Sequence, residues 1–143
     1  MANEMENGNL KALNELKSAI EKSNRIVVLT GAGASVPSGI PDFRSAHGLY
    51  ATSFGKYPAE TVISHDFFMM HPKEFYDFYK SKMVYPDAKP NAMHALLARL
   101  EQSGKIEGIV TQNIDGLHQA AGSKKVLELH GSILRSYCSV CGK

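Results

Sequence analysis

A short apolar run followed at once by a glycine turn constrains this chain more than any other feature. Ile26 to Leu29 is an unbroken aliphatic run, typical of a strand buried on both faces in a parallel sheet. Gly31 and Gly33 follow, and Ser35 is a candidate N-cap of a helix. A strand, a glycine turn and a helix start present free backbone N–H groups to an anion. The pattern therefore predicts either a phosphate site or a plain βα turn.

The loop after this turn carries groups suited to a nucleotide. It ends in Pro41-Asp42-Phe43-Arg44, which combines a stiff backbone with an acid, an aromatic ring and a guanidinium. Such groups can contact a sugar, a flat ring and a diphosphate. The glycine signal is weak alone, and this loop strengthens it.

The rest of the apolar pattern alternates between helical and strand periodicity. Two amphipathic helices are predicted, one before the first strand and one that begins after Asn91. The first should lie on the sheet, and Asn91 is a candidate N-cap of the second. The alternation predicts an α/β fold with parallel neighbouring strands. The predicted helices are 9–22 and 91–103, and the further strands are 106–111 and 126–129.

Residues 51–90 interrupt this alternation with aromatic side chains and prolines. They predict a small helical insertion whose best helix covers 72–83. The aromatic residues at helical spacing are better read as its own core than as a stacking platform, because no basic stripe runs between them.

Polar groups follow the second and third strands. Gln112, Asn113 and Asp115 predict either an Asx turn capping a short helix or a site that recognises a planar carboxamide. His130 ends the third strand and is a candidate general base, the alternative being a ring that bonds a neighbouring carbonyl. Because ligands of open α/β sheets bind beyond the carboxyl ends of the strands, these groups and the glycine turn should share one site.

Two other histidines are assigned structural roles. His94 lies among apolar helix neighbours and is better read as a core or boundary residue. His118 is better read as part of a helix turn than as a site residue.

Length and composition set the remaining bounds. The 143 residues suit one domain, and the 43% hydrophobic and 21% charged content is ordinary for a globular protein. A net charge of +2 argues against nucleic acid or an anionic membrane as partner. Without a secretory signal or an apolar run of spanning length, a cytoplasmic location is expected. Cys138 and Cys141 form a Cys-x-x-Cys pair, which indicates metal binding or redox exchange.

Five ordered motifs resemble those of the sirtuins, the NAD-dependent protein lysine deacylases. The resemblance runs from Leu10 to the last residue. The motifs are Gly31-Ala-Gly-Ala-Ser35, Gly39-Ile-Pro-Asp-Phe-Arg44, Thr111-Gln-Asn-Ile-Asp-Gly-Leu-His118, Leu129-His-Gly131 and Cys138-x-x-Cys141.

The resemblance implies a domain organisation. The chain would be the N-terminal part of a sirtuin catalytic domain, with an incomplete Rossmann-like parallel sheet. Residues 9–50 and 91–133 would form the nucleotide-binding α/β part, 51–90 the helical insertion, and 134–143 the start of a zinc-ribbon module.

The resemblance also implies a reaction between acyl-lysine and NAD that gives lysine, nicotinamide and O-acyl-ADP-ribose. His130 would be the base that deprotonates a ribose hydroxyl, and Asn113 a second catalytic residue. The NAD diphosphate would lie at Ala32 and Gly33. Phe43 and Arg44 would cover the ribose and the nicotinamide. The other cofactor-binding residues would be Gly31, Ser35, Pro41, Asp42, Tyr50, Gln112, Ile114 and Asp115, with Asn113 shared.

Two departures from the sirtuin pattern modify these expectations. Structural zinc takes four ligands, and this chain supplies only Cys138 and Cys141 before it stops at Lys143. We therefore expect a truncated fragment that neither closes a zinc site nor turns over efficiently. In sirtuins that remove acidic acyl groups a Tyr-x-x-Arg reads the carboxylate. The nearest match here has Lys82 three residues after Tyr79, which favours acetyl-lysine.

Four hypotheses for the function follow. The leading one is an NAD-dependent protein deacetylase acting on an acyl-lysine protein or peptide, without a nucleic-acid or membrane partner. The alternatives are a non-catalytic module that binds NAD or ADP-ribose and a mono-ADP-ribosyltransferase. A zinc-ribbon interaction module is the weakest option.

Overall fold

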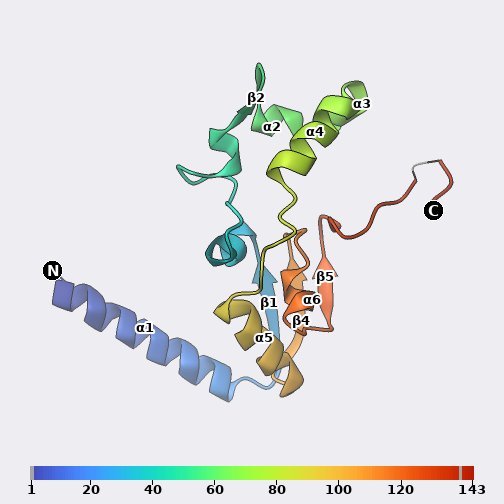
Figure 1. The fold of residues 1–143 in the computed structure, drawn as a ribbon. Helices are drawn as coiled ribbons and strands as arrows, with labels where there is room; N and C mark the ends of the chain where they lie inside the picture. The colour runs from blue at the N-terminus through green and yellow to red at the C-terminus, as the bar shows by residue number, and fades with distance from the viewer. Residues whose placement is uncertain (1, 139) are drawn as a thin grey trace.

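A three-stranded parallel sheet organises the chain (Figure 1). This computed structural model describes residues 2–138 and 140–143. The strand order is β1-β4-β5, so the carboxyl ends of all three strands lie at one edge. The strands predicted from the apolar runs and their parallel pairing are thus confirmed. Their bounds are β1 Ile26–Thr30, β4 Ile106–Thr111 and β5 Val126–Glu128.

One face of the sheet is covered by α5, Ala92–Gln102, which packs against β4 (Figure 1). Ile109 of β4 and Ala98 of α5 are buried at this contact. The predicted cap is confirmed, since the Asn91 side chain accepts hydrogen bonds from the backbone N–H groups of Met93 and His94. The short helix α6, Leu117–Ala120, follows β4 and packs on α5.

The opposite face of the sheet is open, which corrects the prediction of a strand buried on both faces. Leu29, Val110 and Leu127 lie side by side in register across the three strands. Leu29 is 67% exposed and Leu127 61% exposed. An apolar run indicates that a strand can be buried, but whether one or both faces of the sheet are covered depends on the rest of the structure.

The first helix, α1, Ala2–Lys22, projects away from the sheet (Figure 1). The predicted helix and its end at residue 22 are confirmed, but its packing on the sheet is not, because Leu10, Leu13 and Leu16 are exposed. Helical periodicity identifies an apolar stripe without specifying the surface that it meets.

Residues 49–82 form a small helical part with its own core. Leu49, Val62 and Phe78 are buried together in it, so the reading of these aromatic residues as core is confirmed for Phe67 and Phe78. The predicted helix at 72–83 is confirmed as α4, Pro72–Lys82. The other elements are η2 Leu49–Ala51, β2 Ser53–Phe54, β3 Tyr57–Pro58, α2 Ala59–Val62 and α3 His65–Met70. None of the helices in the described part of the chain combines the length and apolarity that a bilayer crossing requires.

Candidate functional site

The glycine turn after β1 leads into a 3₁₀ helix, η1, Ala32–Ser38, rather than an α-helix. Ser35 lies inside this helix, and Gly31 occupies the N-cap position without a side-chain cap, so the prediction of Ser35 as N-cap is wrong. Its hydroxyl instead donates to Asp115 Oδ2 at 2.6 Å, across 80 positions of sequence. A local capping rule cannot anticipate such a long-range partner.

Ser35 joins the two polar residues that follow β4. Asn113 Nδ2 donates to Ser35 Oγ at 3.1 Å, and Asp115 Oδ1 accepts from the backbone N–H of Leu117 at 2.9 Å. The backbone N–H of Asn113 donates to Thr111 Oγ1 at 3.0 Å. The Asx turn is therefore present. Because a carboxylate has about four acceptor positions, Asp115 keeps capacity for a ligand as well.

His130 lies beyond β5 with one ring nitrogen already engaged. Its Nδ1 lies 2.9 Å from the carbonyl oxygen of Gln112. A carbonyl only accepts, so Nδ1 carries the proton and the lone pair of the neutral ring is on Nε2. The predicted bond to a neighbouring carbonyl thus leaves His130 with an orientation suited to accepting a proton at Nε2.

The loop from Asp42 to Tyr50 folds back on itself. Asp42 Oδ1 accepts from the backbone N–H of Ser45 at 2.9 Å, and this bond lowers the pKa of the carboxyl. The rings of Phe43 and Tyr50 meet edge to face at 5.5 Å, and the Arg44 guanidinium lies 6.0 Å from the Tyr50 ring centre. These contacts hold the acid, the aromatic ring and the guanidinium in one place.

Gly48 makes this fold-back possible, and the sequence reading missed it. A Cβ at Gly48 would lie 2.7 Å from Asp42 Oδ1 and 2.7 Å from the Phe43 carbonyl carbon. Because one of these neighbours is backbone, a side chain there would displace the loop. The Gly48 signal is a lone glycine among loop residues, which sequence alone does not distinguish from an ordinary turn.

All these groups surround one cavity of about 730 Å³ between the sheet edge and the small helical part. Gly31 stands outside its lining, but an added Cβ at Gly33 would meet nothing within 4 Å, so the cavity is open above that residue. The predicted site residues that line it are Ala32, Gly33, Ser35, Pro41, Asp42, Phe43, Arg44, Tyr50, Gln112, Asn113, Ile114, Asp115 and His130.

Further lining residues lie outside the predicted cofactor-binding set, although Tyr79 and Lys82 bear on the predicted choice of acyl group. Phe75, Tyr79 and Lys82 line the cavity from one side of α4. Their spacing of four and three residues is a helical face, a signal that was visible but does not say which surface the face meets. The other added residues are Ile40, Leu49, Ile63, Met83, Tyr85 and Ile133.

The profile of the Sir2 family matches residues 31–143. This chain belongs to the Sir2 family. Proteins of similar sequence occur in several bacteria. The NAD-dependent protein deacetylase of Clostridium acetobutylicum is 56% identical over 135 residues, which cover 94% of this chain and 55% of that protein. That of Thermotoga maritima is 51% identical over 133 residues, covering 92% of this chain and 52% of that protein.

Solved Sir2 structures share the fold. A Sir2 variant with a deacetylated p53 peptide and 3′-O-acetyl ADP-ribose superposes with a TM-score of 0.82 at 50% identity, covering 92% of this chain and 52% of that one. Sir2 with a p53 peptide and NAD⁺ gives a TM-score of 0.75 at 50% identity, covering 90% and 50%. The Sir2-family chain described here spans about half the length of the curated relatives it matches.

His118 of this Sir2-family chain is a buried residue of the short helix α6. It is 1% exposed, and its Nε2 lies 2.9 Å from Thr30 Oγ1. The prediction that His118 belongs to a helix turn and not to the site is confirmed, since it lies in α6 and outside the cavity lining. Its burial follows from the packing of α6 against α5. The reading of His94 as a core residue is confirmed, since this side chain is 0% exposed.

Cys138 and Cys141 lie close together on an exposed turn at the end of the chain. The backbone N–H groups of Cys141 and Val140 lower the pKa of the Cys138 thiol. A stabilised thiolate in a Cys-x-x-Cys turn suits half of a zinc site. Within residues 2–138 and 140–143, however, no three His, Cys, Asp or Glu side chains gather around a point, so the zinc site stays a prediction.

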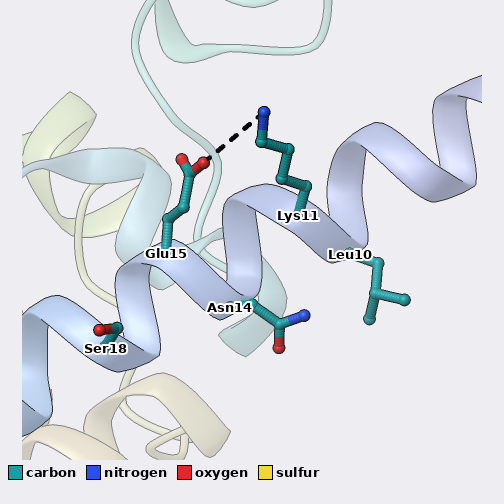
Figure 2. A pocket seen from close by; sticks show the side chains of 5 residues that line it. All are labelled: Leu10, Lys11, Asn14, Glu15 and Ser18. Atoms are coloured by element: carbon teal, nitrogen blue, oxygen red, sulfur yellow. Dashed lines mark ion pairs between the residues drawn. The ribbon is translucent and has the colours of Figure 1, made fainter.

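A second concavity, of about 460 Å³, runs along α1 between side chains of that helix alone (Figure 2). Its ion pair, Lys11 Nζ to Glu15 Oε1 at 4.0 Å, is highly exposed. Exposed ion pairs of this kind contribute little to the stability of the fold. The other side chains drawn in Figure 2 form no catalytic or ligand-binding group with this pair. This concavity shares no residue with the large cavity.

Proposed function

We propose that this chain carries the catalytic site of an NAD-dependent protein lysine deacetylase. The observation that carries the proposal is the meeting of Arg44, Asp115 and His130 around one cavity, although they are far apart in sequence. The 56% identity to a protein deacetylase supports the same reaction. The substrate would be an acetyl-lysine protein or peptide, as in the Sir2 structures solved with acetylated peptides.

NAD would lie with its diphosphate against Ala32 and Gly33, where the cavity is open and η1 begins. Arg44, which stands on the Tyr50 ring, would supply the cation that faces the diphosphate or the ribose. When bound, NAD supplies an electrophilic ribose carbon and nicotinamide as the leaving group. The aromatic lining would exclude water from that carbon.

Asn113 and Asp115 would hold the nicotinamide carboxamide. Asp115 would accept from the carboxamide NH₂, while its bonds to Ser35 and Leu117 fix its orientation. Nε2 of His130 would take a proton from a ribose hydroxyl, because Nδ1 is committed to the Gln112 carbonyl. Cys138 and Cys141 would supply two thiolates to a zinc ion that organises the end of the chain.

The test compares His130→Ala with His65→Ala, a matched change at an exposed histidine outside the cavity. Calorimetry measures NAD binding, and mass spectrometry identifies the products from an acetylated peptide. We expect the chain to bind NAD and His130→Ala to retain that binding. Any deacetylation should fall by about 10²–10⁴-fold in His130→Ala and stay unchanged in His65→Ala.

Other outcomes select the alternatives. Binding of NAD with no product, in this chain and in a version extended to the relatives' length, would indicate a binding module. ADP-ribose attached to the peptide or protein, with the acetyl group retained, would indicate a mono-ADP-ribosyltransferase. The absence of NAD binding in both versions would contradict the proposal as a whole.

Acetyl is proposed over acidic acyl groups on the basis of Lys82. Both Tyr79 and Lys82 line the cavity, but an ammonium lacks the planar fork with which arginine reads a carboxylate. The acetylated form of one peptide should therefore be deacylated faster than its succinylated form. A preference for succinyl that disappears in Lys82→Ala would reverse this assignment.

A further inference from the structure

Two buried histidines lie ring to ring beneath the site, and the proposed reaction gives neither a role. His94 of α5 is 0% exposed and His118 of α6 is 1% exposed. Their ring centres are 4.8 Å apart at an interplanar angle of 64°. Neither ring lines the cavity. Two imidazoles fully withdrawn from water at one point require a physical explanation.

His118 is connected to the Asn113 backbone through two hydroxyls. Its Nε2 lies 2.9 Å from Thr30 Oγ1, the Thr30 hydroxyl donates to Thr111 Oγ1 at 2.9 Å, and the latter also accepts the Asn113 N–H. Because Thr30 uses its single proton on Thr111, His118 donates from Nε2. Its Nδ1 is then an unprotonated nitrogen, and this atom is buried without a partner.

His94 is connected to the glycine turn through Asn91. Its Nδ1 accepts the backbone N–H of Asn91 at 3.3 Å and closes the capping box of α5. The Asn91 side chain donates from Nδ2 to the carbonyl of Ala34 at 2.9 Å and to Ser38 Oγ at 3.0 Å, both in η1. The pair is therefore linked to both segments that form the nucleotide side of the cavity, through Asn91 to η1 and through two threonines to Asn113.

The surroundings of both rings favour neutral imidazoles. A proton added at Nδ1 of His94 would point at the Asn91 N–H, so that hydrogen bond would be lost. A proton added at Nδ1 of His118 would have no acceptor. Burial lowers the pKa of both histidines, and the neighbouring His94 lowers that of His118 further. Asp115 is the charged group that acts on both rings, and its field opposes this effect without overcoming it.

We propose that His94 and His118 are positioning residues whose neutral rings hold the Asn113 backbone and the glycine turn in the nucleotide-binding arrangement. Protonation of His94 breaks its bond to Asn91, and protonation of His118 buries a charged N–H without an acceptor, so either event weakens the nucleotide site. The ligand rests on the proposed function, whereas the hydrogen-bond network does not.

The first experiment measures NAD affinity by calorimetry at pH 7.5 and 5.5 for the chain and for His94→Gln/His118→Gln. Glutamine retains an acceptor for the capping box and an amide donor for Thr30, but it does not titrate. We expect the NAD affinity of the parent to fall by about tenfold over this interval, and that of the variant by less than about threefold. His130 is unchanged in both proteins, so the comparison isolates the effect of His94 and His118.

A second experiment keeps the inference testable if NAD does not bind or the variant does not fold. Nuclear magnetic resonance of the parent chain follows the ring nitrogens of each histidine and the Asn113 amide as pH falls. We expect Nε2–H tautomers at both buried rings at pH 7.5, and an Asn113 shift that follows these rings rather than the exposed His65.

The outcomes separate the two proposals. No NAD binding at any pH, with the Asn113 shift still following the buried rings, contradicts the proposed function alone. NAD binding with the same pH profile in the parent and the double variant overturns the positioning role, even if the variant is less stable. An Asn113 amide indifferent to the protonation of His118 does so too.

Discussion

Ser35 is the residue on which the polar part of the site depends. It accepts from Asn113 and donates to Asp115, and it is 1% exposed. Neither partner is close to Ser35 in sequence, so this hydroxyl links two side chains to η1, while the Leu117 N–H also holds Asp115. An isolated serine in a glycine-rich turn therefore has a larger role than the local cap that its position indicates.

We expect Ser35→Ala to weaken NAD or nicotinamide binding by about tenfold or more, because the buried Asn113 amide and Asp115 Oδ2 both lose their hydrogen bond to the serine hydroxyl. Isothermal calorimetry measures the affinity, and thermal unfolding monitors the fold. Ser103→Ala is the control, since that hydroxyl is exposed and bonds only to the carbonyl of Leu100. Equal affinities for the parent and Ser35→Ala would contradict this role.

Two glycines should respond to alanine in opposite ways. An added methyl at Gly33 meets nothing within 4 Å and enters the cavity, whereas at Gly48 it meets backbone at 2.7 Å. We expect Gly33→Ala to lower NAD affinity by about tenfold with little change in stability, because it narrows the space for the diphosphate. Gly48→Ala should destabilise the chain by about 1–3 kcal/mol. Denaturant unfolding and calorimetry on both variants distinguish the two effects, and a reversed pattern would refute the assignment.

At the scale of elements, the junction between η1 and α5 joins the glycine turn to the sheet. Asn91 forms this junction, because its side chain caps α5 and also donates to the Ala34 carbonyl and the Ser38 hydroxyl of η1. The cap itself is local and was predictable. The bonds to η1 are not, because Asn91 lies more than 50 positions away from both partners.

Asn91→Ala should destabilise the chain by about 1–2 kcal/mol, the usual cost of a lost N-cap, and should also weaken NAD binding. Asn91→Asp is the matched variant, because it keeps the cap acceptor but removes the amide donor to η1. We expect Asn91→Asp to retain most of the stability while losing affinity. If both variants bind NAD as the parent does, the junction has no role in the site.

The contact between α5 and α6 should make stability depend on pH. Burial lowers the pKa of His94 and His118 below 6.5, so the unfolded chain binds more protons than the folded chain in acid. Stability is then fully present above pH 6.5 and is lost as pH falls from 6.5 through the lowered pKa values of the folded state. Urea unfolding between pH 8 and 5 measures this slope, which should be smaller in His94→Gln/His118→Gln. An unchanged slope would mean that other groups cause the acid sensitivity.

At the scale of the whole molecule, the sheet is covered on one face only. Ile109 is 1% exposed beneath α5, whereas Leu29 and Leu127 are largely exposed on the opposite face. The stability of this chain therefore comes from the α5 side of the sheet and from the separate core around Phe78 in the helical part. The cavity lies between these two centres of packing.

This asymmetry predicts unequal costs for substitutions in the same sheet. Ile109→Ala should destabilise by about 2–5 kcal/mol, as core truncations do. Leu29→Thr and Leu127→Thr should change the free energy of unfolding by less than about 1 kcal/mol, because these side chains are already exposed and threonine suits a strand. Denaturant unfolding of the three variants provides the comparison. Large losses at Leu29 or Leu127 would indicate a covered face.

The sequence alone determined the helices and strands, and the edge of the sheet at which the polar residues lie. Aliphatic runs located the three strands, Asn91 and Pro72 located helix starts, and the order of strands and helices placed the polar residues at the carboxyl ends of parallel strands. These signals are local, because hydrogen-bond geometry, side-chain periodicity and backbone stereochemistry act over a few residues. The inclusion of Arg44, Asp115 and His130 in one cavity follows from this edge rule.

Only the tertiary structure decided which surfaces meet. It left the stripe of α1 and one face of the sheet exposed, turned Phe75 and Tyr79 into the cavity, and moved Ser35 from a supposed cap to the centre of the polar network. It also buried His118 against His94. These outcomes depend on contacts between residues tens of positions apart, and local periodicity is the same whichever partner a face finds.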